Sequence, residues 1–341
     1  MPELRQNILL KEWVIISTER SKRPDQLREE KLNCESAYPP YDENCPFCPG
    51  NETKTGNDIT LDAMEINGKW QIRVIPNKYP ALLPPEDGFS VNTTGFFRSM
   101  DGIGHHEVLI EHPQHNLTVA LYEPSHVYHI LRMYQKRMAH LMSFSYVESV
   151  ILFRNHGSRA GASLVHPHSQ IIALPVIPRD VMARMNESIR YHEEHRSCIF
   201  CTMLETELTE GKRIVYESEY FVAFVPYAAF SPFAIWIFPR KHKSSFLYTT
   251  EEELADLSVA LRYVLQKLYY GLNDPDYNYI VRSAPQGYSH TAFFHWYITI
   301  VPRLTRSAGF ELGSGMFINP SIPEENAAFL RDLVLPEEKK T

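Results

Sequence analysis

Neither an excess of positive charge nor a long apolar run is present in this sequence of 341 residues. It carries 34 Lys and Arg against 41 Asp and Glu, which gives a formal net charge of −7. Binding nucleic acid without sequence preference needs a basic face, so the charge balance argues against that function, although a local cluster of arginines would suffice for a small phosphate ligand. No uncharged apolar run approaches the roughly 20 residues of a membrane span. The first residues, from Met1 to Gln6, lack the basic and then apolar segments of a secretory signal, so we expect a cytoplasmic protein.

Cysteine is scarce as well, but its placement is informative. Four of the five cysteines form two Cys-x-x-Cys pairs, Cys45 with Cys48 and Cys198 with Cys201, and Cys34 is left over. In a cytosolic protein such pairs more often bind a metal or carry out redox chemistry than form structural disulfides. The remaining composition, with 44% hydrophobic and 22% charged residues, is typical of a globular chain with a sizeable core.

The chain repeats itself when its two cysteine pairs are aligned. Each pair is followed by an apolar run that predicts a strand, at 107–111 and 233–238. Two histidines follow each run, 51 positions apart in the first half (166 − 115) and 53 apart in the second (295 − 242). These are His115 and His166, then His242 and His295. Matched cysteines and histidines at such similar separations indicate a divergent tandem duplication.

Between its two histidines, each half has the pattern of a helix and then of a short strand. Apolar residues recur at helical spacing over 127–141, and again over 254–268, after a capping box formed by Thr250 and Glu253. Each half closes with a strand that carries its second histidine. We therefore predict an α+β fold in which two duplicated units are built on mainly antiparallel sheet.

The boundary between the two units is expected near residue 175. The first unit would span 1–175 and the second 176–341. The charged segment 176–197, which begins between two prolines, is the expected connector.

Each half offers two thiols and two imidazoles as metal ligands. Zn²⁺ prefers these ligands, and a gap of two residues lets both sulfurs reach one ion. Because all four ligands come from the protein and no position stays open, we expect two structural zinc sites. Their ligands are Cys45, Cys48, His115 and His166 in site 1, and Cys198, Cys201, His242 and His295 in site 2.

A redox function for the cysteine pairs is the alternative. A redox Cys-x-x-Cys is expected to open a helix after a strand. The segment 45–50, with its two prolines and Gly50, predicts a turn instead, so we favour metal binding.

One histidine has no counterpart in the second half. His168 lies two residues after His166, and Tyr297 stands at the matching place in the other unit. Residues two apart on a strand face the same way, so His168 should lie beside the metal-bound His166. Imidazole is substantially neutral, and so nucleophilic, near pH 7. The sequence therefore predicts a single working site in which His168 is a covalent nucleophile towards a nucleotide phosphate.

Gln170 and the loop before this strand fit the same chemistry. Gln170 lies on the same face as His168, and its amide could donate to a phosphoryl oxygen whose charge is stabilised in the transition state. The loop 155–163 contains glycines and hydroxyls of the kind that let backbone amides approach phosphates.

The segment His166-Pro167-His168-Ser169-Gln170 resembles the His-Pro-His-x-Gln active-site motif of the galactose-1-phosphate uridylyltransferases, the transferase branch of the histidine-triad superfamily. The resemblance covers nearly the whole chain. It implies two histidine-triad-like domains, of which only the first carries the nucleophile, and a homodimer. It also implies ping-pong chemistry, in which His168 attacks the α-phosphorus of UDP-glucose, glucose 1-phosphate leaves, and galactose 1-phosphate takes the uridylyl group.

The same resemblance implies the substrate contacts. Gln170 would stabilise the phosphoryl oxygens. Arg20 and Arg23 match an early Arg-x-x-Arg-Pro motif and would approach phosphate. Two nucleotide-contacting asparagines and a phosphate-contacting serine are matched by Asn77, Asn155 and Ser163.

The chain departs from the better-known transferases near its end, where Ser314-Gly315 replaces a Tyr-Glu pair that lies near the hexose. This ending also resembles ADP-glucose phosphorylase, a relative that transfers adenylyl to inorganic phosphate. Pro167 favours the uridylyltransferase, because that relative typically has Ser between the two histidines. We expect a UDP-glucose–hexose-1-phosphate uridylyltransferase. The alternatives are an ADP-glucose or dinucleoside-polyphosphate phosphorylase, and a zinc-stapled nucleotide-binding module without turnover.

Overall fold

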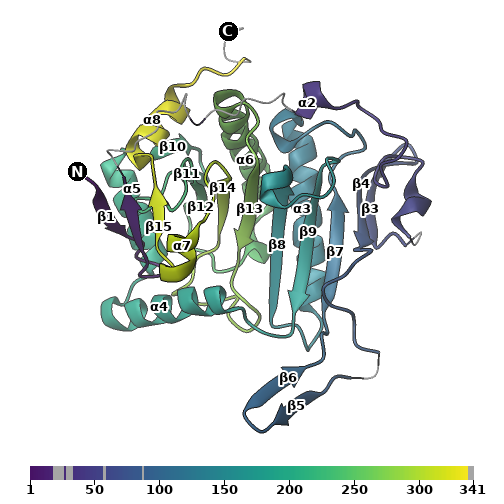
Figure 1. Cartoon of the computed structure of the whole chain (residues 1–341), viewed down its shortest axis with the longest axis horizontal. Coiled ribbons are helices and arrows are strands. Elements are labelled where there is room, and N and C mark those ends of the chain that lie inside the picture. Colours follow the sequence, from purple (N-terminus) through teal and green to yellow (C-terminus); the bar gives the residue numbers. More distant parts are fainter. Residues whose placement is uncertain (18–26, 28–33, 57–58, 87, 337–341) are drawn as a thin grey trace.

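The computed structural model describes residues 1–17, 27, 34–56, 59–86 and 88–336. Its main feature is one sheet of ten strands, to which each half of the chain contributes five (Figure 1). The first half supplies β3 (Asp62–Ile66), β4 (Lys69–Pro76), β7 (His105–Ile110), β8 (Ser149–His156) and β9 (His168–Leu174). The second half supplies β10 (Ile214–Glu217), β11 (Phe221–Phe224), β12 (Ile235–Pro239), β13 (Tyr277–Arg282) and β14 (Tyr297–Pro302).

The two halves of the sheet have the same strand order. From its outer edge inward, the first half runs β3-β4-β7-β9-β8 and the second runs β10-β11-β12-β14-β13. Neighbouring strands are antiparallel throughout, and the halves join where β8 pairs with β13. The predicted α+β fold with duplicated, mainly antiparallel sheet is confirmed.

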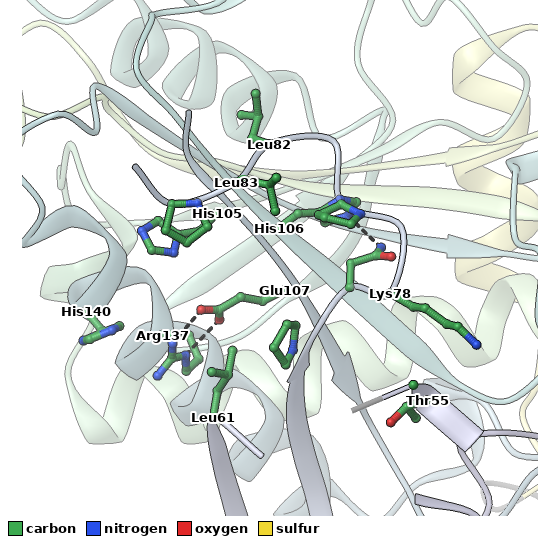
Figure 2. A pocket seen from close by; sticks show the side chains of 15 residues that line it. Thr55, Leu61, Lys78, Leu82, Leu83, His105, His106, Glu107, Arg137 and His140 are labelled. Carbon is green, nitrogen blue, oxygen red and sulfur yellow. Dashed lines mark hydrogen bonds and ion pairs between the residues drawn. The ribbon is translucent and has the colours of Figure 1, made fainter. Parts of the chain in front are cut away.

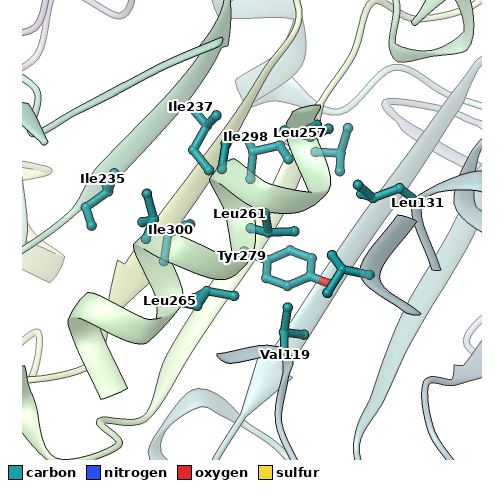
Figure 3. Close-up of a cluster of buried hydrophobic side chains, with 14 of the residues drawn as sticks. Val119, Leu131, Ile235, Ile237, Leu257, Leu261, Leu265, Tyr279, Ile298 and Ile300 are labelled. Carbon is teal, nitrogen blue, oxygen red and sulfur yellow. The ribbon is translucent and has the colours of Figure 1, made fainter. Parts of the chain in front are cut away.

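One face of the sheet is covered by the two long helices, α3 (Pro124–Met142) and α6 (Glu251–Leu272). The capping box of Thr250 and Glu253 that was predicted for the second helix is present. Both helices bury an apolar face against the strands, as amphipathic helices do. Figure 3 shows leucines of α6 packed against the isoleucines of β12 and β14, with Tyr279 between the two halves.

The opposite face is covered differently in the second half. The segment expected as a connector is a helix, α4 (Arg179–His195), and α5 (Ile199–Glu210) follows it. The prediction missed α4 because its sequence is strongly charged, although Val181 and Met185 lie four residues apart and are buried together. These two helices cover an aromatic layer on β11, β12 and β14.

Smaller elements complete the chain. β1 (Glu3–Gln6) and β2 (Trp13–Ile16) form a separate sheet with β15 (Phe317–Asn319), which brings the first strands of the chain beside its last strand. A hairpin of β5 (Val91–Thr94) and β6 (Phe97–Met100) projects from the first half (Figure 1). The short helices are α2 (Cys34–Ala37), α7 (Gly309–Ser314) and α8 (Pro323–Asp332), with the 3-10 turns η2 (Glu52–Thr55), η3 (Val119–Leu121), η4 (Ser158–Ala160) and η5 (Phe246–Tyr248). Among the described helices, none combines the length and apolar character that crossing a membrane requires.

Candidate functional site

His168 is the first residue of β9, and its side chain lies on the sheet face away from α3 and α6. The odd-numbered residues Ile171 and Ala173 pack in the core beneath those helices, so the even-numbered positions of the strand face the other way. The prediction that His166 and His295 belong to the closing strands of their halves was wrong, because β9 begins at His168 and β14 at Tyr297. His166 instead lies in the loop before β9, with Pro167 between it and the strand.

The backbone carbonyl of His166 fixes the ring of His168. It lies 2.8 Å from Nδ1 of His168. A carbonyl can only accept, so Nδ1 carries the hydrogen and Nε2 carries the free lone pair. Burial lowers the pKa of His168, so its ring is neutral at pH 7. Neutral imidazole with a defined tautomer is the form of histidine that acts as a nucleophile.

Phe47 connects the first cysteine pair to His168. It lies between Cys45 and Cys48, in a turn as the sequence predicted. Its ring meets the rings of both His166 and His168 edge-on, at centroid distances of 6.0 and 5.4 Å. The turn that carries the cysteines therefore also packs against His168.

Gln170 and Asn77 both lie beside His106, a residue that the sequence did not single out. The Gln170 Oε1 lies 2.8 Å from Nε2 of His106, and Asn77 Nδ2 lies 3.1 Å from the same nitrogen. Asn77 and His106 line a cavity of about 590 Å³ beside the first residues of β7 (Figure 2). A cavity of this size suits a small-molecule ligand.

Asn155 also belongs to this face of the sheet. Arg154 of β8 pairs with Ser169 of β9, so the next residue, Asn155, lies level with His168 on the neighbouring strand. Its Oδ1 accepts a hydrogen bond of 2.8 Å from Asn278 of the second half.

The structure does not test the remaining predicted substrate contacts. Ser163 is exposed in the loop before β9. Arg20 and Arg23 lie outside the described residues. Their roles therefore stay predictions.

The four residues of site 1 lie together and are buried. Their candidate ligand atoms are all within 4.8 Å of one another. Cys48 Sγ lies 3.5 Å from Nδ1 of both His115 and His166. The Nε2 of His166 lies 2.8 Å from the carbonyl of His112, which holds the hydrogen on Nε2 and leaves Nδ1 for a metal. Burial raises the pKa of Cys45 to about 11, so a metal must displace the proton of this thiol when it binds.

Site 2 has the same four ligands in a more open setting. Cys201 Sγ lies 3.2 Å from Nδ1 of His242 and 3.5 Å from Nδ1 of His295. The Nε2 of His242 is 3.0 Å from the carbonyl of Thr291. His242 is exposed and Cys201 partly so, whereas all of site 1 is buried. The second cysteine pair also differs from the first in its local structure, because Cys198 is the N-cap residue of α5 and does not lie in a turn. A redox Cys-x-x-Cys is expected to follow a strand, whereas this pair follows the helix α4.

The counterpart of His168 in the second half is enclosed by aromatic side chains. Tyr297 stacks on Phe238 at a centroid distance of 4.5 Å and an interplanar angle of 10°. Phe200, which matches Phe47, lies 5.7 Å from it. The position equivalent to His168 is thus part of the core in the second half.

Comparison with known proteins decides the family. The family model described as galactose-1-phosphate uridyl transferase, N-terminal domain, matches residues 1–178, and the model for the C-terminal domain matches residues 184–331. The chain belongs to this family. It is 36% identical to ADP-glucose phosphorylase of Arabidopsis thaliana over 98% of this chain and 93% of that protein. It is 32% identical to galactose-1-phosphate uridylyltransferase of Thermotoga maritima over 97% of this chain and 98% of that protein.

A solved structure agrees with these sequence matches. The ADP-glucose phosphorylase from Arabidopsis thaliana with bound ADP-glucose superposes with a TM-score of 0.81 at 32% identity, over 98% of this chain and 99% of that one. Both names denote nucleotidyltransferases, so this member of the uridylyltransferase family is a nucleotidyltransferase enzyme.

In this uridylyltransferase-family chain, a buried polar cluster lies behind His168, and the sequence did not reveal it. The carboxylate of Glu111 is fully buried and is paired with Arg154. Ser169, next to His168 in the chain, also donates to Glu111, and Tyr134 of α3 lies against the same carboxylate. The sequence placed Glu111 at the end of an apolar strand, where a charged residue is usually solvated, and nothing in the pattern indicated its burial.

Proposed function

We propose that this enzyme transfers a nucleotidyl group from a nucleoside-diphosphate sugar through a covalent intermediate on His168. In the first step Nε2 of His168 bonds to the α-phosphorus, and the bond from that phosphorus to the bridging oxygen breaks. The sugar 1-phosphate leaves with that oxygen and its electron pair. In the second step an oxygen of the acceptor attacks the same phosphorus and releases the histidine. The observation that carries this proposal is the hydrogen bond from Nδ1 of His168 to the His166 carbonyl, which leaves Nε2 free to attack.

The other site residues have supporting roles in the proposal. Gln170 donates its amide to a phosphoryl oxygen as negative charge builds up there. Nucleotide and phosphate contacts are assigned to Arg20, Arg23, Asn77, Asn155 and Ser163. The register of β8 supports Asn155, and the cavity beside Asn77 supports that residue.

For the donor and acceptor we propose UDP-glucose and a hexose 1-phosphate such as galactose 1-phosphate. Pro167, between the two histidines, supports this choice. The second candidate is phosphorolysis of ADP-glucose, with adenylyl transfer to inorganic phosphate. It is supported by the strong similarity to the Arabidopsis ADP-glucose phosphorylase and by Ser314-Gly315, which stands where a hexose-contacting pair is expected.

We also propose that both Cys2His2 groups hold Zn²⁺ and that the chain forms a homodimer of two-unit subunits, divided near residue 175. The donor sets fit zinc, because each offers two sulfurs and two imidazole nitrogens that all lie within 4.8 Å of one another. A zinc ion at site 1 would supply a structural anchor and no reacting group. Cys45, Cys48, His115 and His166 would hold it, and the His166 carbonyl would thereby be fixed against His168.

The test uses donors labelled with ³²P at the α-phosphate and incubated with the purified full chain. We expect UDP-glucose to leave label on the protein and a tryptic peptide containing His168 to carry it. The same donor labelled at the β-phosphate should leave none, because that phosphate departs with glucose. His168→Gly should abolish labelling, whereas His195→Gly, a change at an exposed histidine of α4, should retain it.

The outcomes separate the candidate functions. Labelling by ADP-glucose alone would replace the first candidate with the second. No labelling by either donor would overturn the proposed covalent intermediate on His168 for both candidates.

A further inference from the structure

The ring of His106 is held from two sides, and the two contacts define its tautomer. The main-chain N–H of Ala81 donates to Nδ1 at 3.1 Å, and Nε2 lies 2.8 Å from Oε1 of Gln170. A backbone N–H can only donate, so Nδ1 must be the nitrogen without a hydrogen. The neutral ring then carries its hydrogen on Nε2, and this hydrogen is donated to Gln170.

Asn77 does not compete for this hydrogen bond. Its Nδ2 lies 3.1 Å from Nε2 of His106, but two N–H groups cannot bond to each other. Its Oδ1 already accepts from the backbone N–H of Tyr79 at 2.8 Å. The opposite tautomer of His106 would suit Asn77, but it would set an N–H of the ring against the N–H of Ala81.

The contact to His106 sets which end of the Gln170 amide faces the nucleophile. In the β7–β9 register, His106 is opposite Ile172, Gln170 opposite Val108, and His168 opposite Ile110. Gln170 therefore lies between His106 and His168 along the strand. With its oxygen bonded to His106, its NH₂ group turns to the side on which His168 lies.

We propose that His106 is a positioning residue for nucleotidyl transfer, because it holds the Gln170 amide with its N–H groups towards the phosphorus attacked by His168. This inference rests on the proposed function. An amide that presents N–H stabilises the charge that builds on the phosphoryl oxygens, whereas the same amide turned over presents a carbonyl oxygen that repels it. His106 touches neither reacting atom and acts through Gln170 alone.

A double-mutant cycle on the first half-reaction tests this. The measured quantity is the rate of ³²P-nucleotidylation of His168 at saturating donor. Gln170→Ala should slow it about 10²-fold or more, as loss of an oxyanion donor does. His106→Ala should slow it about tenfold in the wild-type background and less than about twofold in the Gln170→Ala background, because residues that act through one contact are not additive. His106→Gln offers both an N–H and an acceptor oxygen, so it should restore most of the rate.

A structural role would give a different result. If His106→Ala slows the reaction equally in both backgrounds, or if His106→Gln is as slow as His106→Ala, the inference is overturned. Thermal unfolding of each variant reports whether the fold is kept.

A second measurement does not depend on the activity of any variant. In the free wild-type protein labelled with ¹⁵N-histidine, the ring nitrogens of His106 should show the hydrogen on Nε2, and a hydrogen on Nδ1 would overturn the inference. His106→Gln identifies the resonance by its disappearance. If wild-type protein is labelled by neither donor, the proposed function fails and this inference fails with it. If labelling succeeds and the cycle is additive, the inference about His106 fails alone.

Discussion

Glu111 and Arg154 form an ion pair that is closed off from solvent directly behind β9. Nε of Arg154 lies 2.9 and 3.1 Å from the two carboxylate oxygens, and its Nη1 donates to the hydroxyl of Tyr277 at 3.0 Å. Ser169, next to His168, donates to the same carboxylate. The strand that presents His168 on one face is thus held on the other by a charge pair, and Tyr277 ties that pair to the second half.

Removing one charge of this pair should destabilise the fold strongly. Glu111→Gln leaves the Arg154 guanidinium buried without its counter-charge, which costs about 3–5 kcal/mol of unfolding free energy. Urea unfolding followed by circular dichroism measures this. The matched control is Glu194→Gln, which removes an exposed ion pair to Arg190 and should cost less than about 1 kcal/mol. Equal stability of the two variants would contradict the role assigned to Glu111.

Phe47 and Phe200 occupy matched positions, but only Phe47 contacts the proposed nucleophile, His168. Phe47→Leu should slow nucleotidylation of His168 by about ten- to a hundred-fold, because small displacements of a reacting group have large effects on rate. Phe200→Leu is the control and should leave the rate within about twofold. Both changes keep an apolar side chain, so each should cost less than about 1.5 kcal/mol in stability. Single-turnover labelling measures the rates, and an equal loss in both variants would show that Phe47 acts only through the core.

The different exposure of the two Cys2His2 sites predicts that their metals leave at different rates. Metal analysis of untagged protein should find two zinc ions per chain, and a chelator should release one from site 2 well before the other, because His242 is exposed. Cys201→Ser should eliminate the fast phase and keep nucleotidylation. Cys48→Ser should eliminate the slow phase and reduce nucleotidylation. A zinc content well below one ion per chain would refute the metal assignment.

Placing a histidine in the second half should not create a second active site. Tyr297→His in the His168→Gly background should give no labelled protein, because that position is enclosed by Phe238 and Phe200. Thr299 also stands where the first half has Gln170, so the amide donor is missing. Mass spectrometry of the protein after incubation with donor checks this. An adduct on residue 297 would mean that the scaffold alone makes a histidine reactive.

The duplicated architecture was predictable because its motifs recur in the sequence at similar spacings. Two cysteine pairs and two histidine separations define the repeat, and helical spacing with a capping box locates α6. The gathering of the eight cysteine and histidine side chains follows from the same spacings.

The contacts around β9 were not predictable, because they depend on register across strands. His106 meets Gln170 only because β7 and β9 pair with one particular alignment, and no local pattern encodes it. From the sequence alone, Glu111 and Arg154 would be predicted as ordinary surface charges. They are buried only because the sheet and α3 enclose them. The buried face of α4 was also missed, because most of the helix surface is charged and only a few apolar residues lie on the buried face.

The join between β8 and β13 has a reciprocal register. Leu152 and Ile280 are each fourth in their strand, and Phe153 and Val281 are each fifth. Leu152 pairs with Val281 and Phe153 with Ile280, so fourth meets fifth in both directions. Any antiparallel pair of strands has such a register, and what makes this join resemble an isologous interface is that the two halves meet through equivalent strands of the same strand order. The ten-stranded sheet therefore has an approximate twofold arrangement about the β8–β13 join, although only the first half carries a histidine at the position of His168.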